Sequence, residues 1–574
     1  MLDCVITGGT VVDGTGRPGR RADVGIRDGL LVAVGTVDEP ARRTIDAEGL
    51  VVAPGFVDIH THYDAQLFWD PYATPSCLHG VTTVIGGNCG FTIAPLAPET
   101  ADYVMRMLAR VEGMPLESLA GGLAWDWTSF ADWLDRLDGT LGVNAGFLAG
   151  HSTIRRAVMG EAAVGTKASD DHVAQMALLL HDAMDAGALG FSSSLAPTHN
   201  DGDGSPVPSR AATDDELVSL AGTVRDHPGT TLEFIPGIGA FTEREMELMT
   251  AMSLAGRRPL NWNVLVVDSS RPEHYRGQLA AGDHATARGA RVIALTVPDL
   301  MKIRLSFASG MVLDAVPGWA ETFALPMEAR KKTLDDPAER RRLRELTEAP
   351  GAAALSRLLR WERMTVNDVG DPTLGQLVGR TIGDIAAERG REPFDAMLDV
   401  VVADDLRTGL IPPAPGDDDE SWRLRAEVWR DPRAVIGASD AGAHLDMSYT
   451  FSYFTALLGE SVRERGVVGL EDAVHFVTDQ PARLYGLRER GRLAEGWHAD
   501  VTVFDPDRVG RDPARMRHDL PGGAGRLFQE ARGVEHVLVN GVEIVARGEL
   551  TSDRPGTLLR SGRDTETVAI PAAS

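Results

Sequence analysis

Short runs in which apolar and polar residues alternate dominate both ends of the chain. Near the N-terminus, glycine-rich or Asp-Gly turns separate four such runs, at residues 2–6, 10–12, 23–26 and 30–34. Residues 500–505 and 534–541 show the same pattern, which predicts β-strands. A few strands alone bury too little core to be stable. We therefore expect the two ends to pair into one small β-domain, residues 1–54 plus 488–562, with two separate β appendages as the alternative.

Between residue 57 and about residue 310, strand-like runs alternate with segments whose apolar residues recur every three or four positions. Segments 172–186 and 214–225 are of the second kind and are expected to be helices. The predicted strands are 82–85, 143–149, 190–194, 231–236, 259–266 and 292–297. Such β–α alternation favours a parallel sheet, either open or closed into a barrel. A barrel carries its chemistry at the C-terminal ends of its strands.

The alternation stops at about residues 311–430, which are rich in Arg, Glu, Leu and Pro. Segment 336–348 resembles a charged helix, and 417–420 an acidic solvated loop. We expect a mostly helical insertion that is able to cover the site, within a catalytic domain spanning 55–487. The strand pattern resumes at 434–440, and residues 563–574 are expected to form a flexible tail.

Length and charge narrow the class of protein. A chain of 574 residues is too long for one simple hydrophobic core. Its net charge of −26 opposes binding to nucleic acid or to an anionic membrane. The cysteines, Cys4, Cys77 and Cys89, are too few for a disulfide framework and fit a reducing compartment. The first residues lack the basic region of a signal peptide, and no apolar run is long enough to span a membrane. We expect a cytoplasmic protein with neither nucleic-acid nor membrane partners.

Two histidines at the end of the first long strand are the strongest chemical signal. His60 and His62 follow the apolar run 50–57. Residues i and i+2 of a strand point to the same face, so both imidazoles can converge on one metal ion. The alternative is a chance pair of surface histidines.

Other candidate residues also lie at the ends of predicted strands; they are Cys89, His151, Glu233, Asp440 and, just beyond, His444. A thiolate at Cys89 with two imidazoles suits Zn²⁺, and Asp440 is placed to ligate the ion or to accept a proton. Such an ion lowers the pKa of a bound water molecule from its much higher value in bulk water to about 7. Asp440 would then act as general base and acid in hydrolysis of an amide-like bond.

Each of these residues also has a structural interpretation. Cys89 alone would be a small buried residue, and Asp440 a turn former. His151 would cap a helix or lie in the core, and His444 would be a surface residue. Only their joint occurrence at strand ends favours the metal site.

Several segments resemble motifs of the amidohydrolase superfamily and, more narrowly, of the N-acyl-D-amino-acid deacylases (D-aminoacylases). These segments are 54–62, 80–84, 87–90, 150–155, 185–193, 437–440 and 496–505. They cover nearly the whole chain. The resemblance implies an α/β protein with a distorted (β/α)₈ TIM barrel beside a small β-sandwich built from both termini.

The resemblance also implies roles for individual residues. His60 and His62 share one metal position, and Asp440 is the catalytic aspartate. Cys89 takes the bridging role that a carboxylated lysine fills in many relatives, since residues 187–194 contain no lysine. The family usually supplies one histidine from the fifth strand and one from the sixth, whereas segments 231–236 and 260–264 contain none. We therefore expect one zinc ion, with Glu233 as an additional oxygen ligand.

The residues that hold a substrate carboxylate in deacylases have no recognisable counterparts here. The nearest candidates for substrate binding are His151, His199, Arg304 and His444, together with Lys302. The expected activity is metal-dependent hydrolysis of N-acyl-D-amino acids, a reaction at a carbon–nitrogen bond other than a peptide bond. The alternatives are hydrolysis of a cyclic amide or imide, and a divergent member that binds a small molecule without catalysis. The sequence leaves a homo-oligomer open.

Overall fold

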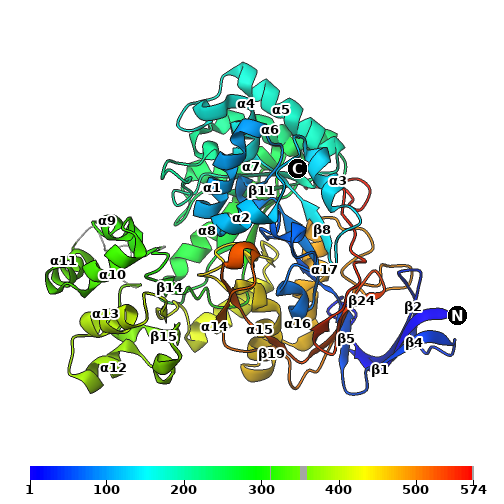
Figure 1. The fold of residues 1–574 in the computed structure, drawn as a ribbon. Helices are drawn as coiled ribbons and strands as arrows, with labels where there is room; N and C mark the ends of the chain where they lie inside the picture. The colour runs from blue at the N-terminus through cyan, green and yellow to red at the C-terminus, as the bar shows by residue number, and fades with distance from the viewer. Residues whose placement is uncertain (311, 350–357, 572–574) are drawn as a thin grey trace.

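Strands from both ends of the chain form one sheet in the computed structural model, which describes residues 1–310, 312–349 and 358–571 (Figure 1). The strand β5 (Val51–Pro54) pairs in parallel with β1 (Leu2–Val11) and antiparallel with β18 (Val501–Phe504). The other strands of this nine-stranded sheet are β2 (Arg20–Arg27), β3 (Leu30–Gly35), β4 (Ala41–Asp46), β23 (Val534–Val539), β24 (Val542–Ala546) and β25 (Glu549–Leu550). The first two expected strands are one strand, β1, whose register shifts between Ile6 and Gly9.

The central part of the chain contributes parallel strands that are buried along almost their whole length. One group is β6 (Phe56–Asp58), β7 (Val81–Gly86) and β8 (Asn144–Phe147). The other is β9 (Ala149–Gly150), β10 (Gly190–Ser194), β11 (Thr231–Ile235), β12 (Leu260–Leu265), β13 (Val292–Thr296) and β17 (Ala434–Ile436). Only Leu148 separates β8 from β9, and a parallel bridge joins Thr61 to Ala441 just beyond β6 and β17. The C-terminal ends of these strands therefore meet at one end of the sheet.

Helices between and after these strands surround the parallel sheet (Figure 1), and their buried apolar residues belong to the main core. They are α1 (Ala101–Val111), α3 (Phe130–Leu137), α4 (His151–Met159), α5 (Asp170–Asp185), α6 (Asp214–Thr223), α7 (Glu243–Gly256), α8 (Pro272–Thr286), α14 (Asp419–Trp429), α16 (Leu470–Val477) and α17 (Asp479–Leu484). The helix α5 shows how a capping residue and a regular apolar face define such a helix. Ser169 caps its N-terminus by accepting a hydrogen bond from the His172 amide, and Met176, Leu180 and Met184 recur at fourfold spacing on its buried face.

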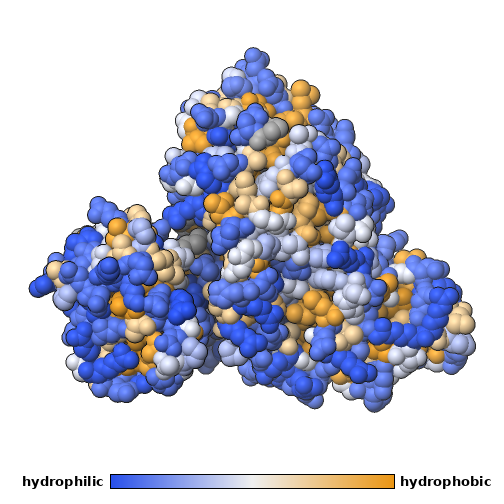
Figure 2. Space-filling model, viewed as in Figure 1, coloured by the Kyte–Doolittle hydropathy of each residue, from blue (hydrophilic) through white to orange (hydrophobic). Residues whose placement is uncertain are grey.

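The described residues between about 303 and 410 form a lobe beside the parallel strands, at the left of Figure 1. Its helices are α9 (Ala320–Phe323), α10 (Met327–Asp335), α11 (Pro337–Glu348), α12 (Ile382–Arg389) and α13 (Pro393–Ala403). The lobe has its own hydrophobic cluster, in which the rings of Trp319 and Trp361 stack with centroids 5.8 Å apart. Polar side chains cover much of its visible face (Figure 2).

This lobe differs from the expected helical insertion in two ways. It contains an antiparallel sheet of β14 (Leu305–Ser306), β16 (Gly409–Ile411) and β15 (Thr365–Asp368). In addition, α14, which falls inside the expected insertion, packs on the parallel strands, because Trp422 and Trp429 are buried in the main core. Part of the expected insertion, residues 350–357, lies outside the described residues.

The chain after residue 562 lies against the body of the molecule over its first part. The Thr565 side chain is fully buried and donates a hydrogen bond to the Gly229 carbonyl at 2.7 Å. The Glu566 amide donates to the Gly486 carbonyl at 2.7 Å. This segment therefore differs from the free tail expected at residues 563–574, since its backbone finds partners on two loops. None of the described helices is long and apolar enough to cross a membrane.

Candidate metal centre

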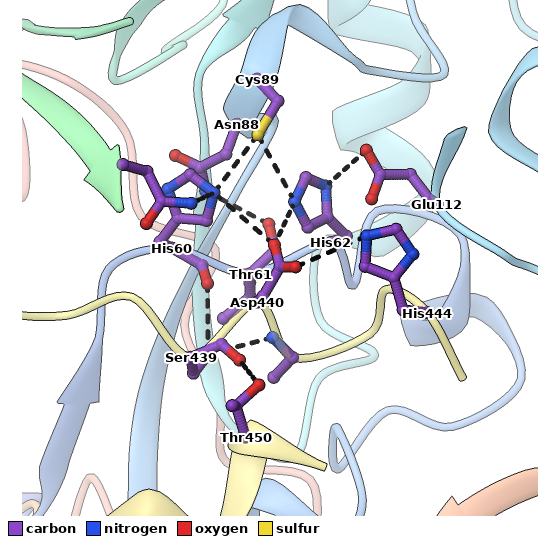
Figure 3. A network of polar contacts seen from close by, with 12 residues as sticks. His60, Thr61, His62, Asn88, Cys89, Glu112, Ser439, Asp440, His444 and Thr450 are labelled. Atoms are coloured by element: carbon purple, nitrogen blue, oxygen red, sulfur yellow. Dashed lines mark hydrogen bonds and ion pairs between the residues drawn. The ribbon is translucent and has the colours of Figure 1, made fainter. Parts of the chain in front are cut away.

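His60, His62 and Cys89 lie together, buried, at the C-terminal ends of β6 and β7 (Figure 3). The Cys89 Sγ atom is 3.3 Å from His60 Nε2 and 3.8 Å from His62 Nε2. One nitrogen or sulfur atom of each residue lies within 4.8 Å of the others. Two imidazoles and one thiol at these separations form a donor set that matches the ligands zinc prefers.

Backbone pairing fixes the direction of both imidazoles. The Thr61 amide donates to the Ile85 carbonyl of β7 at 3.0 Å, and the His62 amide donates to the Ala441 carbonyl at 2.7 Å. The chain beyond β6 is thus held between β7 on one side and the loop after β17 on the other. Thr61 turns its hydroxyl away, to the Ile85 carbonyl at 2.9 Å, so His60 and His62 share the opposite face.

The turn that presents Cys89 depends on the residues just before it. Gly87 has φ 73°, and a Cβ atom there would lie 2.1 Å from the Leu148 carbonyl oxygen, so only glycine fits. The Asn88 amide group donates to the carbonyls of Ile85 and Thr61 at 2.9 and 3.2 Å, which ties the turn to both strands. Cys89 itself has φ 58°, a conformation uncommon outside glycine and frequent at functional sites.

Asp440 reaches the same cluster from the loop after β17 (Figure 3). Its Oδ1 atom is 3.1 Å from His62 Nε2 and 3.8 Å from His60 Nε2, and its Oδ2 atom is 3.8 Å from His444 Nε2. The Asp440 amide and the Ser439 hydroxyl both donate to the His60 carbonyl, at 3.0 and 3.1 Å. Asp440 and His444 also have positive φ, 57° and 49°.

The electrostatics of this cluster favour a bound cation. Burial and the charge of His62 lower the pKa of His60 to about 3. Burial also lowers the pKa of His62, but Glu112 and Asp440 overcome this and raise it to about 10. Burial opposes ionisation of Asp440, yet the bond and charge of His62 hold its pKa below the usual value. Glu112 and Asp440 therefore stabilise a positive charge at this point of the site.

Glu233 contacts the Cys89 backbone, and Asn263 contacts the His60 ring. The Glu233 Oε2 atom accepts a hydrogen bond from the Cys89 amide at 2.9 Å, and burial raises the pKa of Glu233 to about 8. The Asn263 Nδ2 atom is 3.3 Å from His60 Nε2. Glu233 is therefore adjacent to the three-residue cluster but outside the group whose donor atoms lie within 4.8 Å of one another.

Two of the four candidate substrate-binding residues lie near this cluster. His444 faces Asp440, as described above. His199 accepts or donates a hydrogen bond with Ser194 at 2.9 Å and packs against Phe91, with ring centroids 5.3 Å apart. Burial, followed by the charge of His444, lowers the pKa of His199 to about 3. His444 therefore faces Asp440 directly, and His199 lies close enough to His444 for that charge to lower its pKa.

The other two candidates, His151 and Arg304, bond to residues outside the centre, so their expected role in substrate binding is corrected. His151 is fully buried and uses both ring nitrogens, on Ser193 at 2.8 Å and Glu216 at 3.0 Å. Arg304 makes two 2.7 Å bonds to Asp368 in the lobe and lines a separate cavity of about 550 Å³ that includes none of the centre's residues. Neither has the free donors that a substrate at the centre would need.

Glu112 is the residue of the centre that the sequence does not reveal. It directly follows α1, is 3% exposed, and places Oε1 3.6 Å from His62 Nδ1. A carboxylate against the far nitrogen of a metal-facing histidine orients the ring and strengthens it as a ligand. No spacing or strand pattern marks this residue, because it enters the site from the end of a helix.

The comparisons with known proteins agree with this geometry. The model of the amidohydrolase family matches residues 43–545. A D-aminoacylase from Alcaligenes xylosoxydans xylosoxydans is 29% identical over 97% of this chain and 97% of its own length. A solved structure that concerns the functional role of the binuclear metal center in D-aminoacylase has a TM-score of 0.64 and 27% identity, covering 98% of this chain and all of that one. An N-acyl-D-glutamate deacylase from Bordetella bronchiseptica, solved with zinc and a phosphonate inhibitor, gives the same four values.

The chain belongs to the amidohydrolase family. Its parallel strands and covering helices form an α/β, TIM-barrel-like fold. Solved relatives hold metal ions, and the His60–His62–Cys89 cluster provides donors of the type that zinc requires.

Proposed function

We propose that this protein hydrolyses N-acyl-D-amino acids to a carboxylic acid and a free D-amino acid. The observation that carries the proposal is the convergence of His60, His62 and Cys89 with Asp440, whose carboxylate lies 3.1 Å from His62 Nε2. The similarity to D-aminoacylase and to N-acyl-D-glutamate deacylase along nearly the whole chain supports the substrate class.

His60, His62 and Cys89 hold one zinc ion in this proposal. When bound, zinc supplies a Lewis acid for the acyl carbonyl and lowers the pKa of a water molecule. Glu112, at 3.6 Å from His62 Nδ1, orients that imidazole toward the cluster. Burial raises the pKa of the Cys89 thiol well above its usual range, so the thiolate form needs a cation beside it.

Asp440 is the proton carrier. An aspartate carboxylate is ionised at neutral pH, so it can accept the proton of the attacking water. Once protonated, it can deliver that proton to the amide nitrogen as the carbon–nitrogen bond breaks. His444, 3.8 Å from Asp440 Oδ2, and His199, which bonds to Ser194, are the candidates to contact the substrate.

The finer architecture belongs to the same proposal. We assign the parallel strands to a distorted (β/α)₈ barrel of residues 55–487, closed between β6 and β17 and across the one-residue gap between β8 and β9. The bridge between Thr61 and Ala441 supports closure. Residues 1–54 and 488–562 would form the β-sandwich beside it, supported by the shared nine-stranded sheet.

A substrate panel tests the activity. Purified zinc-loaded protein is incubated with N-acetyl-D-amino acids, their L enantiomers and a cyclic imide, and the released amine or acid is quantified. We expect release from the D substrates and at least about 100-fold lower kcat/KM for the L forms, equivalent to roughly 2.7 kcal/mol of discrimination. Preferential opening of the cyclic imide, or no turnover of any amide by folded zinc protein, would contradict the proposal.

A further inference from the structure

The cavity beside Arg304 lies where three parts of the chain meet, and no residue of the metal centre lines it. Its volume of about 550 Å³ is typical of small-molecule sites. The lobe contributes Ser306, Asp368 and Arg407, the loop after β17 contributes Asp446, and the chain at and just after β20 (Arg515–Arg517) contributes Met516 and His518.

Arg304 ties the lobe to the loop after β17 at this cavity. Its side chain is 3% exposed and makes two 2.7 Å bonds to the Asp368 carboxylate. The same guanidinium donates to the Arg407 carbonyl at 3.1 Å and to the Asp446 carbonyl at 3.4 Å. One buried, charge-balanced group therefore fixes the backbone of both Arg407 and Asp446, whose residues line the cavity from different parts of the chain.

Several polar groups of the cavity lack partners within the protein. The side chains of Asp446 and His518 make no hydrogen bond or ion pair with any other described residue. Arg407 donates Nε to the Asp404 carbonyl at 3.3 Å and places Nη2 3.8 Å from Asp405, so its Nη1 group has no partner in the described part of the chain. One carboxylate and two groups that can carry positive charge thus line one cavity.

A free amino acid matches this combination of groups. Its carboxylate can accept hydrogen bonds from Arg407 and His518, and its ammonium group can donate to Asp446. Met516 and Val369 add apolar surface for an aliphatic side chain. An N-acyl amino acid has no ammonium group, so the Asp446 carboxylate would favour the free amino acid over its acylated form.

We propose that the cavity beside Arg304 is a second small-molecule site, which binds a free amino acid with an apolar side chain and thereby changes kcat at the metal centre. The two charges of the ligand pair the groups that the fold leaves without partners. Binding rests on the cavity alone, whereas the effect on kcat rests on the proposed function, whose product is a free amino acid.

The loop after β17 connects this cavity to the metal centre. His444 Nε2 lies 3.8 Å from Asp440 Oδ2, and Asp446 follows two residues later. The amides of Met447 and Ser448 both donate to the His444 carbonyl at 2.8 Å, so residues 444–448 form one tight turn. A ligand that draws on the Asp446 carboxylate therefore acts on the position of His444 beside the proton carrier.

Calorimetry on the full-length zinc-loaded protein tests binding. Ala308, which lines the cavity, is replaced by Trp to fill it, so the difference between wild type and Ala308→Trp isolates binding in the cavity. The probes are D-leucine, 4-methylpentanoate without the ammonium group, and D-leucinamide without the carboxylate. We expect cavity binding of D-leucine at least about 10-fold tighter than that of either analogue, because each analogue loses one charged partner. Equal binding of D-leucine to wild type and Ala308→Trp would overturn the inference.

Two charge-removing substitutions assign the ligand's partners. Asp446→Asn keeps the side-chain shape, Arg407→Gln removes the guanidinium, and each should weaken D-leucine binding at least about 10-fold. Asp419→Asn and Arg363→Gln are the matched controls, since both residues are exposed and neither lines the cavity. Circular dichroism checks folding. Unchanged D-leucine affinity in folded Asp446→Asn would refute the assignment.

Kinetics separate this site from ordinary product inhibition. An amino acid bound at the metal centre competes with substrate and raises KM alone, whereas one in the cavity changes kcat. Added D-leucine should change kcat for N-acetyl-D-alanine at least about twofold in wild type and leave kcat unchanged in Asp446→Asn. A purely competitive effect in both proteins would refute the link to catalysis. Hydrolysis without binding in the cavity refutes this inference alone, and binding there without hydrolysis refutes the proposed function alone.

Discussion

Asp440 and His62 are 378 residues apart in the chain, yet their side chains meet at 3.1 Å. The contact exists because the chain beyond β6 pairs with the chain beyond β17. The Thr61–Ala441 bridge and the bond from the His62 amide to the Ala441 carbonyl bring the two loops together. The first and last parallel strands therefore supply two of the metal ligands and the proton carrier of one site.

Replacing the proton carrier should separate catalysis from metal binding. Asp440→Asn keeps the side-chain shape but removes the base, so kcat should fall about 10²- to 10⁴-fold, the usual contribution of general acid–base catalysis. Zinc content, measured by mass spectrometry, should stay near that of the wild type. Asp472→Asn, on α16 and paired with Arg430 instead of a residue of the centre, serves as control. A fall of less than about 10-fold would show that another group carries the proton.

Cys89 should matter for zinc affinity far more than its size suggests. Cys89→Ser replaces a soft thiolate by a hard hydroxyl and should weaken zinc binding at least about 100-fold, since even residues behind the ligands typically contribute 10- to 100-fold. A competition assay with a chromogenic chelator measures the affinity. Cys4→Ser, in the terminal sheet, is the matched control. Equal affinities in the two variants would place the ion elsewhere.

The lobe of residues 303–410 should unfold separately when its core is damaged. Trp319 is fully buried, stacks on Trp361 and donates Nε1 to the Leu343 carbonyl at 3.0 Å. Trp319→Ala should destabilise the lobe by about 3–5 kcal/mol. Hydrogen exchange should rise in the lobe while β10 and β11 stay protected. Uniform loss of protection in both regions would show one cooperative unit instead.

His79 should give the fold part of its acid sensitivity. It is buried, with its nitrogens on Thr455 and the Gln529 carbonyl, and burial lowers its pKa from 6.5 to about 3. The unfolded chain then binds a proton that the folded chain does not, so stability falls as pH drops from 6.5 to 3. The slope is about 1.4 kcal/mol per pH unit from this group. Denaturant unfolding of His79→Gln should show a shallower slope by that amount; an unchanged slope would contradict the assignment.

Regular periodicity predicted the parallel strands better than the irregular parts. The expected strand at 190–194 matches β10 (Gly190–Ser194), and the expected 259–266 contains β12 (Leu260–Leu265). Both strands are almost wholly buried, although β10 ends in three serines and β12 alternates apolar residues with asparagine. The sequence pattern did not predict the sheet of the lobe, because β14 has only two residues and pairs with β16 about a hundred positions later. Strands that short carry no period.

The residues of the site also divide into those that the strand pattern predicts and those that only the fold reveals. His60, His62 and Cys89 come together as their places at strand ends suggest, because parallel strands end at one edge. Glu112 and Asn263 join them through a helix end and an irregular stretch of β12, where the register shifts. The sequence does not show that His151 bonds to Glu216 or that Arg304 bonds to Asp368. Both pairs join residues that are far apart in the chain.

Zinc titration of activity tests the central claim most directly. Metal-free protein receives increasing Zn²⁺, and hydrolysis of an N-acetyl-D-amino acid is measured at each addition. The account predicts that activity rises linearly and reaches at least about 80% of its maximum at one zinc per chain, because one nitrogen–sulfur cluster holds the ion. Full activity in metal-free protein, or no activity until a second equivalent is bound, would contradict it.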